Sequence, residues 1–226
     1  MAQKLLVEGD TDIHFITHLC MRKGLNAPKG YENETAYKKD FVTVAGSKSK
    51  LKAELKLLLK KPDSDIQNLG IVLDADSESE QAVLDTWTSI KSILQANGYR
   101  DIQNVPTNKG VVITQTGKPK VGVWIMPNNQ GNGYLEDFYA QMIDKDDAFW
   151  QKAVEITEGY VANKENRFRE IALSKAKVHT WLAWQAHPEL PLGLSVKAYN
   201  NLLNLNLPLV DNFVEWFQNT FELVEN

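Results

Sequence analysis

The sequence contains a single cysteine, which excludes an internal disulfide. Cys20 is the only one among 226 residues, so the fold depends on its packed core and not on covalent cross-links. This scarcity agrees with a reducing compartment. Cys20 falls on the apolar side of a segment with helical spacing, and we expect it to lie in the core.

Long apolar runs are also missing. No stretch approaches the roughly 18 apolar residues that a membrane-spanning helix needs. Near the N-terminus the only apolar run is Leu5, Leu6 and Val7, which is too short for the core of a signal peptide. We therefore expect a cytoplasmic protein that makes no membrane contact.

Positive charge is not in excess. The chain has 25 Lys and Arg against 29 Asp and Glu, a formal net charge of -4. Any binding of nucleic acid would therefore depend on a local basic patch or on metal ions that bridge phosphates. Hydrophobic residues at 43% and charged residues at 24% are typical of a folded globular protein.

Several catalytic motifs are absent. The sequence has no G-x-S-x-G nucleophile motif and no phosphate-binding G-x-x-x-x-G-K-[ST] loop. His14 and His18 are spaced four apart, but Phe15 stands where a metalloprotease has glutamate, so we do not expect a zinc site there. The Gly-led basic stretch at 46–52, GSKSKLK, is interpreted as a helix start with a solvated face.

Residues 4 to about 145 alternate β-rich and helical segments, a pattern typical of βαβ units and a mainly parallel sheet. The apolar run Gly70–Leu73 shows no alternation, which predicts a central strand covered on both faces. The turn-rich QTGKP predicts an antiparallel hairpin near the edge. The expected strands are 4–8, 40–46, 68–76, 110–114 and 120–126, and the expected helices are 11–23, 47–61, 79–97 and 135–143.

Beyond residue 146 the β-rich segments stop. Helices are expected at 147–162, 166–186, 195–204 and 209–223, and no long Gly, Ser or Pro stretch separates them from the first part. The predicted fold is therefore an α/β domain over 1–145, with a mainly parallel sheet flanked by helices. An all-helical C-terminal region, 146–226, is expected to pack on it.

Acidic residues follow three of these segments at comparable places. Glu8 lies at the end of the first expected strand, Asp74 and Asp76 lie at the end of the third, and Glu136 with Asp137 opens the helix after the loop PNNQGNG. The carboxyl ends of parallel strands lie along one edge, so these residues can converge. On an extended chain Asp74 and Asp76 would point the same way, roughly 6 to 7 Å apart. Such carboxylates can share divalent ions, with Mg²⁺ or Mn²⁺ favoured over zinc.

The same residues have a simpler interpretation, because carboxylates and hydroxyls also stabilise helix N-termini. It applies at two helix starts, to Asp10, Thr11 and Asp12 and to Glu136 and Asp137. Asp74 and Asp76 would then form a solvated turn. For Asp10 and Thr11 we adopt the capping interpretation. For Asp74, Asp76 and Glu136, the coincidence of three acidic clusters at one edge favours a metal site.

LLVEGDTD (5–12) and IVLDAD (71–76) together resemble the Toprim signature. That signature forms the metal site of topoisomerases, bacterial primases, overcoming-lysogenization-defect (OLD) nucleases and some ribosomal RNA maturation nucleases. The segments GVWIMPNNQGNGYLEDF (122–138) and LSKAKVHTWLAWQAHPELPLG (173–193) are similar to an uncharacterised Toprim-related family of small stand-alone proteins. The resemblance spans most of the chain and implies a Toprim-like sheet.

The resemblance also implies roles for particular residues. Glu8 matches the glutamate that ligates metal or transfers protons, and Asp12 matches the second acid of the first motif. Further matches are the metal-binding Asp74 and Asp76, and Glu136 as a ligand of a second metal. A lysine supports the transition state in OLD-type nucleases, and Lys175 or Lys177 is the candidate; a solvated helical lysine is the alternative.

These observations predict a Mg²⁺- or Mn²⁺-dependent nuclease that hydrolyses DNA or RNA phosphodiesters. Its expected catalytic residues are Glu8, Asp74, Asp76 and Lys175. Topoisomerase or primase activity is not expected, because the sequence shows no ATPase, zinc-ribbon or DNA-gate segment and its tyrosines Tyr139 and Tyr160 lie in helical patterns. The alternative is a non-catalytic metal- or nucleotide-binding module that acts through protein partners.

Overall fold

The computed structural model describes residues 2–28, 37–60, 66–76, 81–199 and 201–223. Within them the chain forms a five-stranded sheet in the order β2-β1-β3-β5-β4. Its strands are β1 (Ala2–Val7), β2 (Val42–Val44), β3 (Ile66–Asp74), β4 (Val111–Ile113) and β5 (Lys120–Met126). All neighbouring pairs are parallel except β4 with β5. The predicted α/β class, the central third strand and the antiparallel edge are confirmed.

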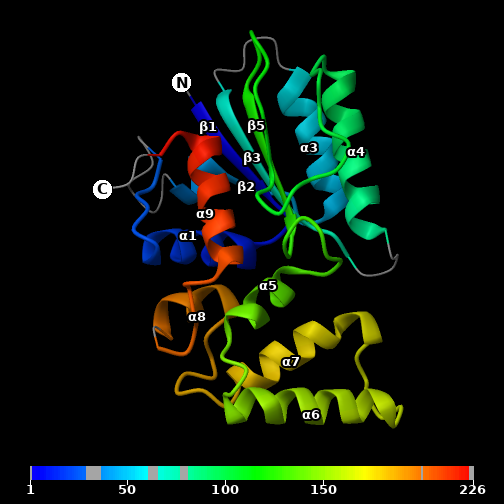
Figure 1. Ribbon diagram of the computed structural model, residues 1–226, viewed down its shortest axis with the longest axis vertical. Helices are drawn as coiled ribbons and strands as arrows, with labels where there is room; N and C mark the ends of the chain where they lie inside the picture. The colour runs from blue at the N-terminus through cyan, green and yellow to red at the C-terminus, as the bar shows by residue number, and fades with distance from the viewer. Residues whose placement is uncertain (1, 29–36, 61–65, 77–80, 200, 224–226) are drawn as a thin grey trace.

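Two helical layers cover the sheet, as Figure 1 shows. Helices α3 (Lys48–Lys60) and α4 (Ala82–Ala96) lie on one face, and α1 (Asp10–Arg22) and α9 (Pro208–Phe221) lie on the other. Alternation along β1 serves both layers, because Leu6 packs with α3 and α4 while Leu5 and Val7 pack with α1 and α9. The molecule therefore has two cores separated by the sheet.

Helix α9 packs closely on the sheet because two glycines lie side by side beneath it. Gly70 on β3 pairs with Gly122 on β5. A Cβ at Gly70 would lie 2.6 Å from Phe221 Cζ, and one at Gly122 would lie 2.0 Å from Thr220 Oγ1. Side chains at either position would push the helix away, so this pair allows the C-terminal helix to cover the centre of the sheet.

The remaining helices lie beyond the carboxyl ends of the parallel strands (Figure 1). Helix α5 (Leu135–Met142) leads into α6 (Ala148–Ala162) and α7 (Leu173–Leu182), which pack on each other, and α8 (Leu192–Ala198) packs on α1. The C-terminal region is helical as predicted. Because α9 joins the sheet layer while α5, α6 and α7 cap its end, the boundary after residue 145 stays a prediction.

Some predicted element bounds are wrong. Strand β2 has three residues, because a π-helical turn, Tyr37–Phe41, occupies the start of the expected strand. Helix α7 begins at Leu173, after a short 3₁₀ turn, because Arg169 is extended. Helix α8 ends at Ala198, several residues before the expected end. No helix in the described part of the chain is long and apolar enough to span a bilayer.

A candidate acidic site at the carboxyl edge of the sheet

The site lies where the order of the strands reverses. From β1 the chain passes to β2 on one side and then returns to β3 on the other side of β1. Such a reversal opens a crevice between the carboxyl ends of the two strands, where ligands bind in open α/β sheets. Glu8 directly follows β1, and Asp74 ends β3. The topology therefore places these two carboxylates on the two sides of the crevice.

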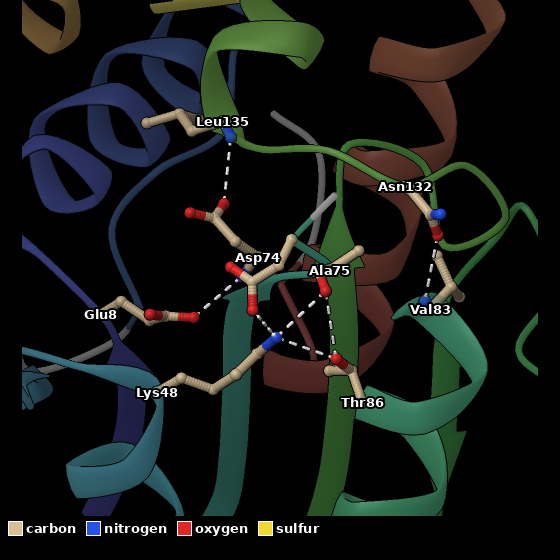
Figure 2. Close-up of polar contacts among 9 residues, drawn as sticks. Glu8, Lys48, Asp74, Ala75, Val83, Thr86, Asn132 and Leu135 are labelled. Atoms are coloured by element: carbon tan, nitrogen blue, oxygen red, sulfur yellow. Dashed lines mark hydrogen bonds and ion pairs between the residues drawn. The ribbon is translucent and has the colours of Figure 1, made fainter. Parts of the chain in front are cut away.

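Glu8 and Asp74 meet as predicted. Glu8 Oε1 accepts a hydrogen bond from the backbone N–H of Asp74 at 3.0 Å, and Asp74 Oδ1 accepts one from the N–H of Leu135 at 3.0 Å (Figure 2). Leu135 is the first residue of α5, so Asp74 satisfies an otherwise unpaired N–H at a helix N-terminus. These two bonds join three segments that are far apart in the sequence.

Asp12 has both a structural and an electrostatic role. Its Oδ2 accepts a hydrogen bond from the N–H of Gly9 at 2.7 Å, which caps α1. Burial, and then the neighbouring charges of Glu8 and Glu136, raise the pKa of Asp12 to about 7. The capping interpretation and the site interpretation are therefore compatible for this residue.

Four carboxylates, Glu8, Asp12, Asp74 and Glu136, form what we call the inner acidic cluster. Burial raises the pKa of Asp74 well above its ordinary value, and repulsion from the other three carboxylates raises it further. Burial also raises the pKa of Glu8, although the hydrogen bond from Asp74 opposes the shift. Glu136 is only 7% exposed. Full ionisation of the cluster is therefore unfavourable without a further positive charge.

Asp76 is placed differently from the expectation. Its φ of 72° is left-handed, and its backbone exchanges two hydrogen bonds with Gly133, at 3.1 and 2.9 Å. The assumption of an extended chain through Asp74 and Asp76 is therefore wrong, because the backbone turns at Asp76 to bridge the loop before α5. The carboxylate of Asp76 forms an ion pair with Lys48 Nζ at 2.6 Å.

Lys48 was not anticipated as part of the site. Its ammonium donates to Asp76 Oδ2 at 2.6 Å, to the carbonyl of Ala75 at 3.1 Å and to Thr86 Oγ1 at 2.9 Å (Figure 2). The interpretation of 46–52 as a helix start is confirmed, but its first lysine is not solvated, with a side chain 19% exposed. The available signal was the position of this stretch, immediately after β2 at the same sheet edge.

The loop between β5 and α5 fixes the start of α5 against α4. Asn132 Oδ1 accepts a hydrogen bond from the N–H of Val83 at 3.3 Å (Figure 2), and Gly133 forms the bridge with Asp76. Asp137 caps α5 by accepting from the N–H of Tyr134 at 2.8 Å. The capping interpretation therefore holds for Asp137, whereas Glu136, one residue earlier, belongs to the cluster.

The structure distinguishes the two candidate lysines on α7. Lys175 Nζ lies 3.7 Å from Glu136 Oε1 and 5.5 Å from the centre of the Tyr134 ring. Lys177 instead forms an ion pair with Glu158 at 2.6 Å. Of these two, only Lys175 contacts the inner acidic cluster.

The two histidines and the cysteine considered from the sequence all lie on α1. His14 and His18 stack on α1 with ring centres 6.3 Å apart, and Cys20 is buried, as expected. Among the described residues, no group of three or more His, Cys, Asp or Glu side chains is already arranged to hold a metal ion. The inner acidic cluster nevertheless fits a hard divalent cation in charge and in ligand type, since all its donors are carboxylate oxygens.

Comparison with known proteins places the chain in a family but assigns no activity. No curated protein and no solved structure matches it. The model of the family "Protein of unknown function (DUF3226)" matches residues 2–222, nearly the whole chain. The chain therefore belongs to the DUF3226 family.

Proposed function

We propose that this protein is a Mg²⁺- or Mn²⁺-dependent nuclease that hydrolyses phosphodiester bonds of DNA or RNA with a Toprim-type acidic site. One observation carries the proposal: Asp74 is buried among three other carboxylates that come from separate segments, and its pKa is raised as a result. Clustered acids of this kind are typical of functional sites, because repulsion between the carboxylates destabilises the fold unless a positive ligand offsets it.

The inner acidic cluster is the proposed cation site. Glu8, Asp12, Asp74 and Glu136 would hold the ion, and Asp76 would join them from the rim of the crevice. A bound divalent cation supplies charge stabilisation to a phosphoryl group and lowers the pKa of water. The ligand set explains the choice of cation, because carboxylate oxygens with no sulfur and no histidine suit magnesium and manganese.

The remaining residues have distinct proposed tasks. The pKa of Glu8 is raised, and Glu8 lies next to Asp74. The Glu8 carboxylate is therefore placed to accept and return a proton. Lys48 fixes the orientation of Asp76. Lys175, half exposed beside Glu136, is placed to offset negative charge that develops on a phosphate at the mouth of the crevice.

A second candidate is a non-catalytic metal- or nucleotide-binding module that acts through protein partners. It is favoured by the net charge of -4 and by the lack of a preassembled three-ligand set in the described residues. Both candidates are consistent with our proposal of a cytoplasmic location, which the single buried cysteine supports.

Purified protein incubated with single- and double-stranded DNA and RNA, with and without Mn²⁺, separates these candidates. Cation-dependent cleavage by the wild type and by Asp85→Asn, a control at an exposed acid on α4, but not by Asp74→Asn, supports the nuclease. Thermal stabilisation by Mg²⁺ or Mn²⁺ without cleavage favours the module. If neither ion causes cleavage or thermal stabilisation, both candidates are contradicted.

A further inference from the structure

Helix α3 carries a row of lysines that begins at the acidic site. Lys48, Lys52 and Lys56 are spaced four apart and therefore share one side of the helix. At 1.5 Å rise per residue, successive members lie about 6 Å apart and the row spans about 12 Å. Because α3 starts at the carboxyl edge and runs back along the sheet (Figure 1), the row leads away from the site.

The first two lysines of this row differ in their partners. Lys48 is held by Asp76, Ala75 and Thr86. Lys52 is also partly buried, yet it has no hydrogen bond or ion pair among the residues that the structure describes. A partly desolvated ammonium without an acceptor is unfavourable, and an anion bound at that point would relieve the cost.

Helical spacing places Lys52 one turn from Lys48, on the side of α3 from which Lys48 reaches Asp76. Burial lowers the pKa of Lys52, the charge of Lys48 lowers it further, and Glu8 and Asp76 oppose the shift. The two carboxylates that attract it already have other partners, because Glu8 accepts from Asp74 and Asp76 is bound to Lys48. Lys52 therefore stands beside the crevice as a cation available to an external ligand.

We propose that Lys52 binds a backbone phosphate of a nucleic-acid strand, and that Lys56 extends the contact along α3. This inference rests on the proposed function and names the surface that delivers its substrate. One strand of B-form DNA carries a phosphate about every 3.4 Å along the helix axis, so a row of about 12 Å spans about three to four phosphates. A strand bound along the row reaches the crevice at the Lys48 end, where Lys48 orients Asp76 and Lys52 contacts the substrate.

Binding of labelled short single strands of DNA and RNA, measured by fluorescence anisotropy in EDTA over a range of salt concentrations, tests this. Lys52→Gln should weaken binding severalfold and reduce the slope of log affinity against log salt by about 0.7, the value for one phosphate contact on a single strand. Lys56→Gln should have a smaller effect in the same direction. The matched control is Lys50→Gln, on the opposite side of α3 beside Thr43 and Leu57.

Equal weakening by Lys50→Gln and Lys52→Gln would show a general charge effect and overturn the inference, as would failure of the wild type to bind either strand. Melting temperatures of the variants should equal that of the wild type, which excludes misfolding. Since no catalytic cation is present, binding lost specifically in Lys52→Gln supports the contact even where Mn²⁺-dependent cleavage is never seen. Lys52-dependent binding without any cleavage would contradict the proposed nuclease activity and still support the binding surface on α3.

Discussion

Asp74 and Asp76 are separated by one residue, yet their surroundings are opposite. Asp74 lies in the inner acidic cluster, where burial raises its pKa and the charges of the other three carboxylates raise it further. Asp76 lies outside the strand, 45% exposed, with the ammonium of Lys48 at 2.6 Å. Lys48 thus neutralises Asp76 directly, whereas the lysine nearest the inner acidic cluster in the described residues, Lys175, pairs with Glu136 at 3.7 Å and only partly offsets four carboxylates. The comparison locates the requirement for an added cation at Asp74.

The largest expected effect comes from exchanging Asp74 for asparagine. Asp74→Asn keeps an oxygen for the N–H of Leu135 but removes the central charge of the proposed cation site, so cleavage should fall by at least about 100-fold with the electrostatic stabilisation that the cation supplies. The stabilisation by Mg²⁺, about 2.7 kcal/mol at one hundred times its Kd, should also disappear. Activity assays and thermal melts with and without Mg²⁺ measure both effects.

Asp76→Asn is the matched comparison, and it should retain most of the Mg²⁺-induced stabilisation. In EDTA, Asp74→Asn should be as stable as the wild type or more stable, because a buried like charge has gone. A result in which Asp76→Asn alone abolishes the Mg²⁺ effect would place the cation on the Lys48 side and reverse the comparison.

Stability without divalent cations should depend on pH through the inner acidic cluster. The pKa of Asp12 rises from an ordinary 3.8 to about 7 in the folded protein. Between these values the unfolded chain has lost the proton and the folded chain keeps it, so stability should fall as pH rises through this window. Affinity for Mg²⁺ should increase over the same range, because ligation requires the deprotonated form.

Thermal melts in EDTA across a pH series measure this trend, and Asp12→Asn tests its origin. Asparagine can still accept from Gly9, so the cap is kept while the titrating group is removed. The decline in stability with pH should then become shallower. An unchanged slope in Asp12→Asn would show that Asp74 or Glu8 dominates the titration.

Strand ends could be predicted well from the sequence, and this is why Glu8 and Asp74 could be paired. Both residues directly follow apolar runs, and parallel strands place their carboxyl ends at one edge whatever the intervening sequence. The placement of α9 could not be predicted in the same way. Its contact with the sheet depends on Gly70 and Gly122 falling opposite each other, and that register is set only when β3 and β5 pair.

The arrangement of Asp76 and Lys48 could not be predicted from the sequence either. A left-handed φ at a residue other than glycine is uncommon, and here it follows from the bridge to Gly133 in a distant loop. Lys48 has the sequence context of a solvated helical lysine. Its burial arises because β2 ends beside β1, which brings the start of α3 over the strand ends, and no local pattern encodes that neighbour.

A smaller effect is expected from Lys48→Met. The change removes three hydrogen bonds, to Asp76, Ala75 and Thr86, but the partner carboxylate is exposed to solvent that compensates for much of the loss. We expect the free energy of unfolding to fall by about 1 kcal/mol, measured by urea denaturation in EDTA. Lys50→Met, on the exposed side of the same helix, should be neutral. Equal losses in both variants would remove the distinction between a bound and a solvated lysine on α3.

The smallest effect on folding is expected from Lys175→Met. This variant also tests the side of the inner acidic cluster at Glu136. Its side chain is 49% exposed, so the free energy of unfolding should change by less than about 0.5 kcal/mol. The charge of Lys175 lowers the pKa of Asp12 and of Asp74, so its removal should shift the pH profile of Mg²⁺ binding to higher pH. Lys177→Met removes the same charge next to Glu158 and should leave the profile unchanged. Identical profiles for the two variants would mean that proximity to Glu136 gives Lys175 no special influence, and that the cluster is balanced by its bound cation alone.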